Sequence, residues 1–499
     1  MKIILLILSI LTGLPVFAQS LMTPLQINNY SRYTSYEELT KYVNQLDKSS
    51  PLLKVETIGK SVQGRNLYAM MFSSGEFGTD SSKIKVLLLA QQHGNEQSGK
   101  EGAMLLAAEL LKPENHYLFD KIELAVVPQM NPDGSEAGKR LNNNEEDLNR
   151  NHLVLTEPEV IALHKFFDKY LFEASLDIHE YYPYGDSWKK YGYRYNTDEF
   201  IGPVNNPNIA ADIMKLENSQ YIPFMKKYLE ERNFSNFIYC PGGPPGVNYN
   251  RNSTFDINDG RQSFGIQNTF SFIQEGLNAE NYSTENIRHR AEGQKTGMRC
   301  FLEFIFQNSQ EIKFMVIHDR NQMLRGTNDA SITIQSEHSG NGEKLNLPVH
   351  SYSTNRDSVL TITDYRPVVK SIKDVTMPAG YLVPKRLKEV TDWINRQSIT
   401  HIVYSQSASY KVTEYKITAI DSIDFEGDRI VNPNMVLNDY HLKISPGEYL
   451  YLPTAQLKGT MLVIALEPKS MLGLVTYKQF SHLLQKGETY PILRVENDN

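Results

Sequence analysis

Two histidines and one glutamate in this sequence have the residue types and the spacing of a metal site. His93 and Glu96 lie three positions apart in Gln91-Gln-His-Gly-Asn-Glu96, and His179 follows later in Asp177-Ile-His-Glu180. Two imidazoles and one carboxylate leave the fourth position of a tetrahedral zinc ion open for water, which is the ligand set of catalytic zinc. We therefore predict that His93, Glu96 and His179 bind one zinc ion per chain.

The spacing of the first pair is weak evidence alone, because the chain has 12 histidines and His289-Arg-Ala-Glu292 repeats that spacing. The second pair lies in a charged stretch, Glu285 to Lys295, which predicts a solvated helix. His93 instead follows a strongly apolar run, in a loop, where binding and catalytic residues concentrate. We expect no metal at His289.

Apolar runs of strand length alternate with stretches of helical period between residues 30 and 310. This alternation is typical of an α/β fold, and nearly continuous apolar runs are typical of strands buried on both faces of a mostly parallel sheet. The predicted strands are Lys85–Ala90, Glu123–Gln129, Ala174–Ile178 and Thr269–Ile273, with a helix over Gly99–Lys112 and a turn at Asn131-Pro-Asp-Gly134. Ligands of open α/β sheets bind beyond the carboxyl ends of the strands, and the three metal candidates fall there.

The sequence changes character after about residue 310. Alternating segments such as Ser331–Gln335 and Ser358–Thr363 predict strands, and helices are expected over Lys385–Arg396 and Tyr477–Lys486. Because 499 residues exceed what one hydrophobic core usually serves, two domains are expected. We predict a signal peptide at residues 1–18, an α/β catalytic domain at residues 19–310 and a smaller strand-rich domain at residues 311–499, of unknown role.

The N-terminus has the pattern of a cleavable signal peptide. Met1-Lys2 is followed by the apolar run Ile3–Leu8, and Val16-Phe-Ala18 supplies the small residue that precedes cleavage. The run is shorter than the roughly 18 to 20 residues that a membrane span needs, and no later stretch approaches that length. We expect a secreted or periplasmic protein without a membrane span.

Composition excludes other classes of function. The net charge of -7 and the absence of a Lys/Arg cluster make nucleic acid an improbable partner. Cys240 and Cys300 are the only cysteines, too few for a disulfide framework or a cysteine-rich metal site. One disulfide and two free buried thiols both remain open, and the oligomeric state is not indicated.

Five short motifs follow one another in the order and at the intervals of a known family. They are Ile58-Gly-Lys-Ser-Val-Gln-Gly-Arg65-Asn-Leu-Tyr68, His93-Gly-Asn-Glu96, Asn131-Pro-Asp-Gly134, Asp147-Leu-Asn-Arg-Asn151 and the strand-borne His179. Over roughly residues 30 to 310 the chain resembles the carboxypeptidase A family of zinc metallopeptidases, and its C-terminal region resembles those of large exported bacterial members. The resemblance implies a mixed, mostly parallel sheet flanked by helices, and hydrolysis of the C-terminal peptide bond of peptides or proteins.

The same resemblance implies roles for individual residues. His93, Glu96 and His179 would bind zinc, and Asp147 would orient the first histidine. Asn149 and Arg150 would hold the terminal carboxylate of the substrate, in keeping with the paired donors that a guanidinium offers a carboxylate.

The resemblance also implies a general base and an oxyanion contact. Arg140 would polarise the scissile carbonyl and stabilise its oxyanion, and Glu275 would be the base at the end of the last sheet strand. Glu303 is the rival base, although it falls in a probable helix. Tyr249 is the nearest match to the tyrosine that covers the substrate in the family.

The residues around the last ligand leave the substrate open. Asp177-Ile-His-Glu180 departs from the animal digestive enzymes and is closer to bacterial and deacylase-like branches that include enzymes acting on cell-wall peptides. The alternatives are a peptidoglycan-peptide amidase or deacylase with the same zinc site, and a catalytically inactive binding protein that keeps the fold.

Overall fold

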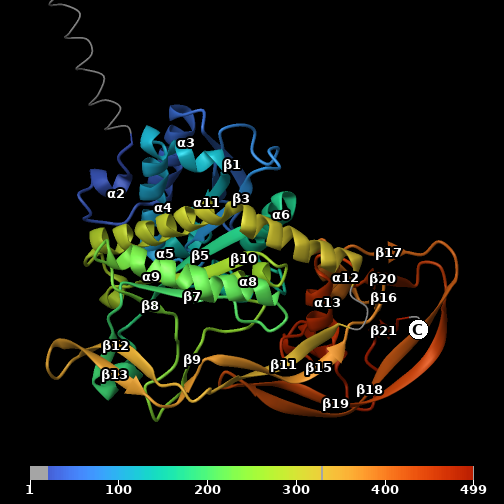
Figure 1. Ribbon diagram of the computed structural model, residues 1–499. Coiled ribbons are helices and arrows are strands. Elements are labelled where there is room, and N and C mark those ends of the chain that lie inside the picture. The colour runs from blue at the N-terminus through green and yellow to red at the C-terminus, as the bar shows by residue number, and fades with distance from the viewer. Residues whose placement is uncertain (1–20, 327–329, 498–499) are drawn as a thin grey trace, which may run out of the picture.

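The computed structural model describes residues 21–326 and 330–497, so the predicted signal peptide lies outside the described residues. Its largest sheet has the strand order β1-β2-β4-β3-β5-β10-β7-β8 (Figure 1). The strands are β1 (Leu53–Lys60), β2 (Asn66–Phe72), β3 (Ile84–Ala90), β4 (Ile122–Val127), β5 (Ala174–Tyr181), β7 (Glu199–Pro203), β8 (Asn236–Ile238) and β10 (Phe270–Leu277). The run β4-β3-β5-β10 is parallel, and so is the pair of β7 and β8. The pairs β1-β2, β2-β4 and β10-β7 are antiparallel. The mixed, mostly parallel sheet is confirmed.

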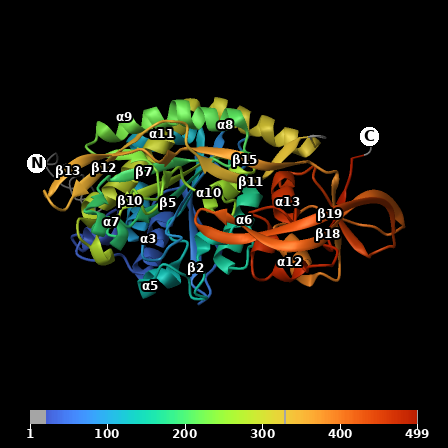
Figure 2. The same ribbon diagram turned by 90° about the horizontal axis from the view of Figure 1, so that it is seen from below.

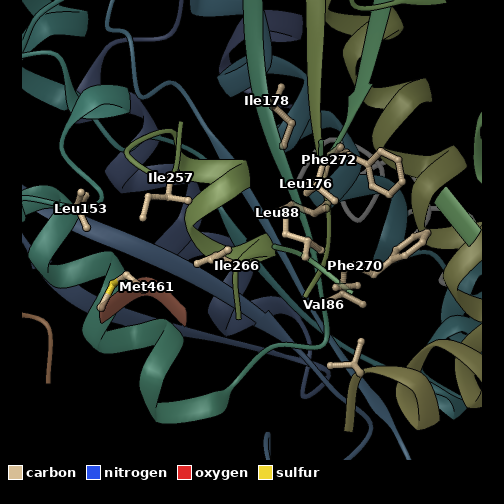
Figure 3. Close-up of a cluster of buried hydrophobic side chains, with 14 of the residues drawn as sticks. Val86, Leu88, Leu153, Leu176, Ile178, Ile257, Ile266, Phe270, Phe272 and Met461 are labelled. Carbon is tan, nitrogen blue, oxygen red and sulfur yellow. The ribbon is translucent and has the colours of Figure 1, made fainter. Parts of the chain in front are cut away.

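Helices cover both faces of this sheet. Alternate residues of β3 point to opposite faces, so Val86 and Leu88 belong to the core that Figure 3 shows, and Leu87 and Leu89 belong to another. The first core joins the sheet to α4 (Gln97–Leu110), α9 (Ile222–Glu230) and α11 (Ile287–Arg325). The second joins it to α6 (Pro158–Tyr170) and α10 (Gly260–Gly265). The central strands are therefore buried on both sides, which explains their apolar sequence.

The helix predicted from Tyr477 to Lys486 is wrong. That segment contains only the short turn η6 (Ser481–Leu483). The apolar residues that gave the segment its helical spacing, Phe480, Leu483 and Leu484, are buried in the core by this turn. The other predicted late helix is confirmed as α12 (Lys388–Arg396).

The second half of the chain is rich in strands, as expected. One sheet has the order β17-β20-β16-β21-β18-β19. Its strands are β16 (Gly380–Pro384), β17 (Ile402–Val403), β18 (Ala408–Phe425), β19 (Asp428–Ile444), β20 (Tyr449–Pro453) and β21 (Leu493–Val495). Smaller sheets pair β11 (Ser331–Ser339) with β15 (Val368–Thr376), and β12 (Leu345–Ser351) with β13 (Arg356–Ile362).

The two halves of the chain share strand pairs and a core. β12 also pairs with β6 (Tyr193–Tyr195), and β14 (Tyr365–Arg366) pairs with β9 (Asn250–Arg251). The large apolar core includes Met461 of α13 (Gly459–Leu466), which Figure 3 labels together with sheet residues such as Leu88. The predicted boundary at residue 310 falls inside helix α11, two residues after a kink at Asn308 (φ -113°, ψ 16°), and it stays a prediction.

A long β-hairpin leaves the six-stranded sheet. β18 and β19 are joined by Glu426 and Gly427, whose φ angles of 55° and 103° are those of a tight two-residue turn. The hairpin runs from the six-stranded sheet back toward the first half of the chain (Figure 2). Its tip therefore reaches residues far from it in sequence.

Two further expectations concern the thiols and the membrane. Cys240 and Cys300 are both buried and free, so the alternative of a disulfide between them is excluded. Within residues 21–326 and 330–497, no helix combines the length and the apolar character that crossing a membrane requires.

The first prediction tests the shared core. Trp393 of α12 is completely buried, and its indole nitrogen donates a hydrogen bond to the Leu153 carbonyl at 2.8 Å. Trp393→Ala leaves a cavity between the two halves, so the free energy of unfolding should fall by about 3 to 5 kcal/mol in urea titration. Phe314→Ala, at a side chain that is 73% exposed, is the control and should change it by less than about 0.5 kcal/mol. Equal stability of both variants would contradict a common core.

Candidate active site

The metal candidates lie where parallel strands end at one edge of the sheet. β3 ends at Ala90, and the loop after it carries His93 and, directly before α4, Glu96. β5 carries His179. β10 carries Glu275, which is opposite His179 in the parallel register. The His93–Glu96 pair, His179 and Glu275 are far apart in the chain, and they converge because these strands share a direction.

His93, Glu96 and His179 are close enough to share one ion. Nδ1 of His93 lies 2.8 Å from one oxygen of Glu96, and Nδ1 of His179 lies 3.0 Å from the other. The two Nδ1 atoms are 3.1 Å apart, and all three residues are buried. Bonds of about 2.0 to 2.2 Å place the ligand atoms of tetrahedral zinc about 3.3 to 3.6 Å apart. The donors fit a zinc ion after outward shifts of a few tenths of an ångström.

Each histidine has a carboxylate behind it. Nε2 of His93 lies 3.1 Å from Asp147 Oδ1, the contact that the resemblance implied. Nε2 of His179 lies 3.0 Å from Asp177 Oδ1, and the Gln92 amide donates to the other Asp177 oxygen at 2.7 Å. These contacts leave both Nδ1 atoms facing the shared centre. Sequence reasoning missed Asp177, although residues two apart on a strand share a face.

Arg140 lies beside this cluster. Its Nε and Nη2 donate to Asp147 Oδ2 at 3.1 and 3.0 Å, and its Nη1 is 3.4 Å from Glu96 Oε1. The side chain is 44% exposed and lines the cavity over the metal candidates. A fixed guanidinium at this place can donate hydrogen bonds to an oxygen that becomes negative.

Asn149 and Arg150 line the same cavity. The Asn149 side-chain oxygen accepts from the Gly260 backbone at 2.7 Å, and its amide nitrogen is 3.3 Å from His179 Nε2. Burial acts to lower the pKa of Arg150, but nearby carboxylates, Asp259 first among them, outweigh it and raise that pKa. Arg150 is therefore a permanent cation that faces a space large enough for substrate.

Glu275 has the environment of a general base. It is 6% exposed and lines the cavity with the metal candidates. Burial raises the pKa of this carboxyl to about 7, and the charge of Glu96 contributes to the rise, while the Tyr239 hydroxyl stabilises the ionised form. A base with a pKa near the working pH transfers protons effectively in both directions.

The structure places the rival residues elsewhere. Glu303 of α11 accepts from Arg299 at 2.7 Å and from the Tyr117 hydroxyl at 2.6 Å, and it is not part of the cavity lining. The ring of Tyr249 lies under Arg366, with the guanidinium 3.9 Å from its centroid, and is not part of the lining.

The second histidine–glutamate pair forms ion pairs on the surface of α11. His289 pairs with Asp198 at 2.8 Å and is about half exposed. Glu292 pairs with Lys295 at 2.6 Å. Each side chain thus has a partner of its own.

The cavity has a volume of about 500 Å³. Several lining residues were missed by the sequence reasoning: Tyr181, Tyr182, Trp188, Tyr195, Tyr239, Arg251, Tyr282 and Glu426. Tyr181 and Tyr182, two and three positions after His179, were a usable signal, because they lie close to a predicted ligand in sequence. Glu426 offered no such signal, since it comes from the second half of the chain.

Glu180, which makes the motif around His179 depart from the animal enzymes, is neutralised. It pairs with Arg290 at 2.6 Å and accepts from the Ser98 backbone, in the first turn of α4, at 2.9 Å. Its carboxylate is buried. Glu180 thus fixes the start of α4, and because its charge is paired it adds no free charge to the site.

The chain is similar to known carboxypeptidases. Residues 39–232 match the family model of zinc carboxypeptidases. "Carboxypeptidase 2" of Trichophyton rubrum is 22% identical over 474 residues, covering 93% of this chain and 87% of that protein. "Carboxypeptidase D" of Mus musculus is 26% identical over 282 residues, covering 49% of this chain and 20% of that protein. These matches support a metallocarboxypeptidase. Because the relatives named are fungal and mammalian, a bacterial source of this metallocarboxypeptidase stays a prediction.

Solved structures are also similar to this chain. A metallo-carboxypeptidase from Burkholderia cenocepacia is 18% identical with a TM-score of 0.43, covering 56% of this chain and 71% of that one. A metallo-carboxypeptidase from Pseudomonas aeruginosa, in complex with (2-guanidinoethylmercapto)succinic acid, is 20% identical with a TM-score of 0.42, covering 57% and 71%.

The second prediction concerns the metal. His93→Ala or His179→Ala should reduce bound zinc to a small fraction of one ion per chain, because each change removes one of three donors. Elemental analysis of the purified protein measures this directly. His289→Ala is the matched control and should retain zinc. Stoichiometric zinc in either of the first two variants would show that the ion is held elsewhere.

The third prediction separates the two candidate bases. Glu275→Gln keeps the shape of the side chain and removes the proton acceptor, so zinc content should stay unchanged while kcat falls by about 100-fold or more. Glu303→Gln should leave kcat close to that of the wild type, because its contacts are with Arg299 and Tyr117. The reverse pattern of rates would assign the base to Glu303.

Proposed function

We propose that this protein is a zinc-dependent carboxypeptidase that hydrolyses the C-terminal peptide bond of peptides or proteins. The observation that carries the proposal is the convergence, in one cavity, of the donor cluster, Glu275 and Arg150. His93, Glu96 and His179 would hold one zinc ion. Zinc supplies Lewis-acid chemistry, which lowers the pKa of water and polarises a carbonyl group.

The residues of the chain account for the proton transfers. The Glu275 carboxylate takes a proton from the attacking water and delivers it to the nitrogen of the leaving amine. Burial raises the pKa of this carboxyl above its ordinary value, which makes it a stronger base. Arg140, held by Asp147, donates hydrogen bonds to the oxygen that becomes negative when water adds to the carbonyl.

Arg150 and Asn149 limit cleavage to the end of the chain. A guanidinium offers paired donors to a carboxylate, and the amide of Asn149 adds another donor. A substrate anchored by its terminal carboxylate presents its last peptide bond to Glu275. The same anchor excludes bonds in the middle of a chain, because these have no carboxylate at that distance.

We further propose that the protein is exported, as a secreted or periplasmic enzyme. The order of a charged, an apolar and a small-residue segment within residues 1–18 supports export. Cell-wall peptides also end in a carboxylate, so they are candidate substrates in such a compartment beside ordinary peptides.

The proposal is tested by incubating the zinc-loaded protein with a mixed peptide library and identifying the products by mass spectrometry. Single residues released from the C-terminus are expected. Products cut within the chain would identify an endopeptidase instead. Release of an acyl or amide group from peptidoglycan fragments, without release from peptides, would favour the amidase.

The fourth prediction tests the carboxylate anchor. Arg150→Ala should lower kcat/KM for a free-acid peptide by about 30-fold, the low end for loss of a charge-assisted pair, because this guanidinium is exposed to the cavity. The wild type should discriminate strongly against the C-terminally amidated peptide, and Arg150→Ala should discriminate much less. Arg366→Ala is the control, since Arg366 stacks on Tyr249 outside the cavity lining. Equal wild-type rates on the acid and the amide would contradict the anchor.

A further inference from the structure

The tip of the β18–β19 hairpin forms part of the cavity wall. Glu426 occupies the turn between the two strands and lines the same cavity as His93 and Glu275. Arg251, at the end of β9, lines it as well. Both residues lie outside residues 39–232, the part of the chain that matches the zinc carboxypeptidase model. This wall therefore belongs to a part of the molecule that lies outside the matched family model.

Glu426 and Arg251 form an ion pair across the two halves of the chain. Nη2 of Arg251 lies 2.6 Å from Glu426 Oε2, and each side chain is 14% exposed. The other carboxylate oxygen is 3.1 Å from Nε2 of His338, whose pKa is lowered by burial. At pH 8 this histidine is neutral, so the group contains one cation and one anion.

The hairpin tip is packed in place. Phe425, next to Glu426, lies edge-on against Phe255 with ring centroids 5.4 Å apart. Phe255 is 2% exposed, and its ring centroid lies 5.3 Å from that of His338. The carboxylate is consequently held at the wall, and substitution of one partner leaves the other charge facing the cavity.

The remaining fixed charges of the cavity already have partners. Arg140 pairs with Asp147, Glu180 pairs with Arg290, and Asp259 lies 3.6 Å from Nε of Arg261. Arg150 is the cation reserved for the terminal carboxylate under the proposed function. The Arg251–Glu426 pair is thus the charged feature left to interact with the rest of a bound substrate.

We propose that Arg251 and Glu426 are specificity-determining residues, whose mutual neutralisation makes the enzyme prefer an uncharged residue at the C-terminus of its substrate. The inference rests on the proposed carboxypeptidase function. A charged side chain entering the cavity meets one attractive and one repulsive group, so it gains nothing for the loss of its hydration. If Glu426 is lost, the cation of Arg251 remains and favours an acidic C-terminal residue. If Arg251 is lost, the anion of Glu426 remains and favours a basic one.

The fifth prediction is a charge-preference experiment on the zinc-loaded, full-length enzyme. Three peptides that differ only in the C-terminal residue, Gln, Glu or Lys, are compared at pH 8 by kcat/KM. Glu426→Gln should raise the ratio of the Glu to the Lys peptide by about tenfold or more, because the unpaired Arg251 attracts the Glu side chain and repels the Lys side chain, while water and salt screen part of the full Coulomb effect. Arg251→Gln should lower the same ratio by about tenfold.

The double variant and a surface variant are the controls. Arg251→Gln combined with Glu426→Gln leaves no net charge, so its ratio should return to the wild-type value, which independent structural damage cannot produce. Asp428→Asn, at an exposed residue just after the same turn, should leave the ratio unchanged. Thermal unfolding of each variant checks that the fold is retained.

The outcomes distinguish this inference from the proposed function. Wild-type release of Gln with unchanged Glu-to-Lys ratios in both single variants would overturn the inference alone. An equal loss of rate on all three peptides would also overturn it, since that result describes a structural pair. If the wild type released no C-terminal residue from any peptide, the carboxypeptidase function and the inference would fail together.

Discussion

The parallel register of β3, β5 and β10 is the constraint on which the site depends. Leu89 pairs with Asp177, and Glu275 pairs with His179, so the ends of the three strands meet at one edge. A slip of one residue along any strand would turn its side chains to the opposite face. The apolar residues that pack against helices on both faces of the sheet prevent such a slip. Core packing and the positions of the site residues are therefore consequences of the same register.

Burial of the site concentrates negative charge that a cation must balance. Glu96, Asp177 and Glu275 are all buried within reach of two histidines, and Asp147 adds a fourth carboxylate behind the first of them. Unpaired carboxylates are costly to bury, because they lose their hydration. A divalent ion at the donor cluster offsets part of that cost, so metal binding and stability of this region should be coupled.

The sequence predicted the parts of the site that lie close together along the chain. His93 with Glu96, and Asn149 with Arg150, sit in short motifs, and the structure brings them into one cavity, with Asp147 behind His93. The apolar strands were predictable for the same reason, because each is a local pattern. The wrong helix after Tyr477 shows the limit of that reasoning, since apolar spacing indicates burial but does not distinguish a helix from a turn.

Contacts between distant segments could not be predicted in this way. Glu426 and Arg251 are 175 positions apart, and their pairing depends on how the β18–β19 hairpin crosses to the first half of the molecule. Tyr239 and Tyr249 illustrate the same difficulty over a shorter range. Both lie in the poorly patterned stretch before Asp259, and Tyr239, not Tyr249, faces the cavity.

The second half of the chain contributes to the site through more than the hairpin. Trp393 donates to the Leu153 carbonyl at 2.8 Å, and Gln397 donates to the carbonyls of His152 and Leu153 at 3.0 and 2.7 Å. These carbonyls lie two and three positions after Arg150 in the chain, so α12 and Gln397 at its C-terminal end fix the loop that presents the guanidinium. The hairpin fixes the opposite wall through Arg251. The proposed chemistry lies in the first half of the chain. The shape and the charge of the space in front of the metal site depend on the second half. Substrate preference can therefore change without alteration of the metal site.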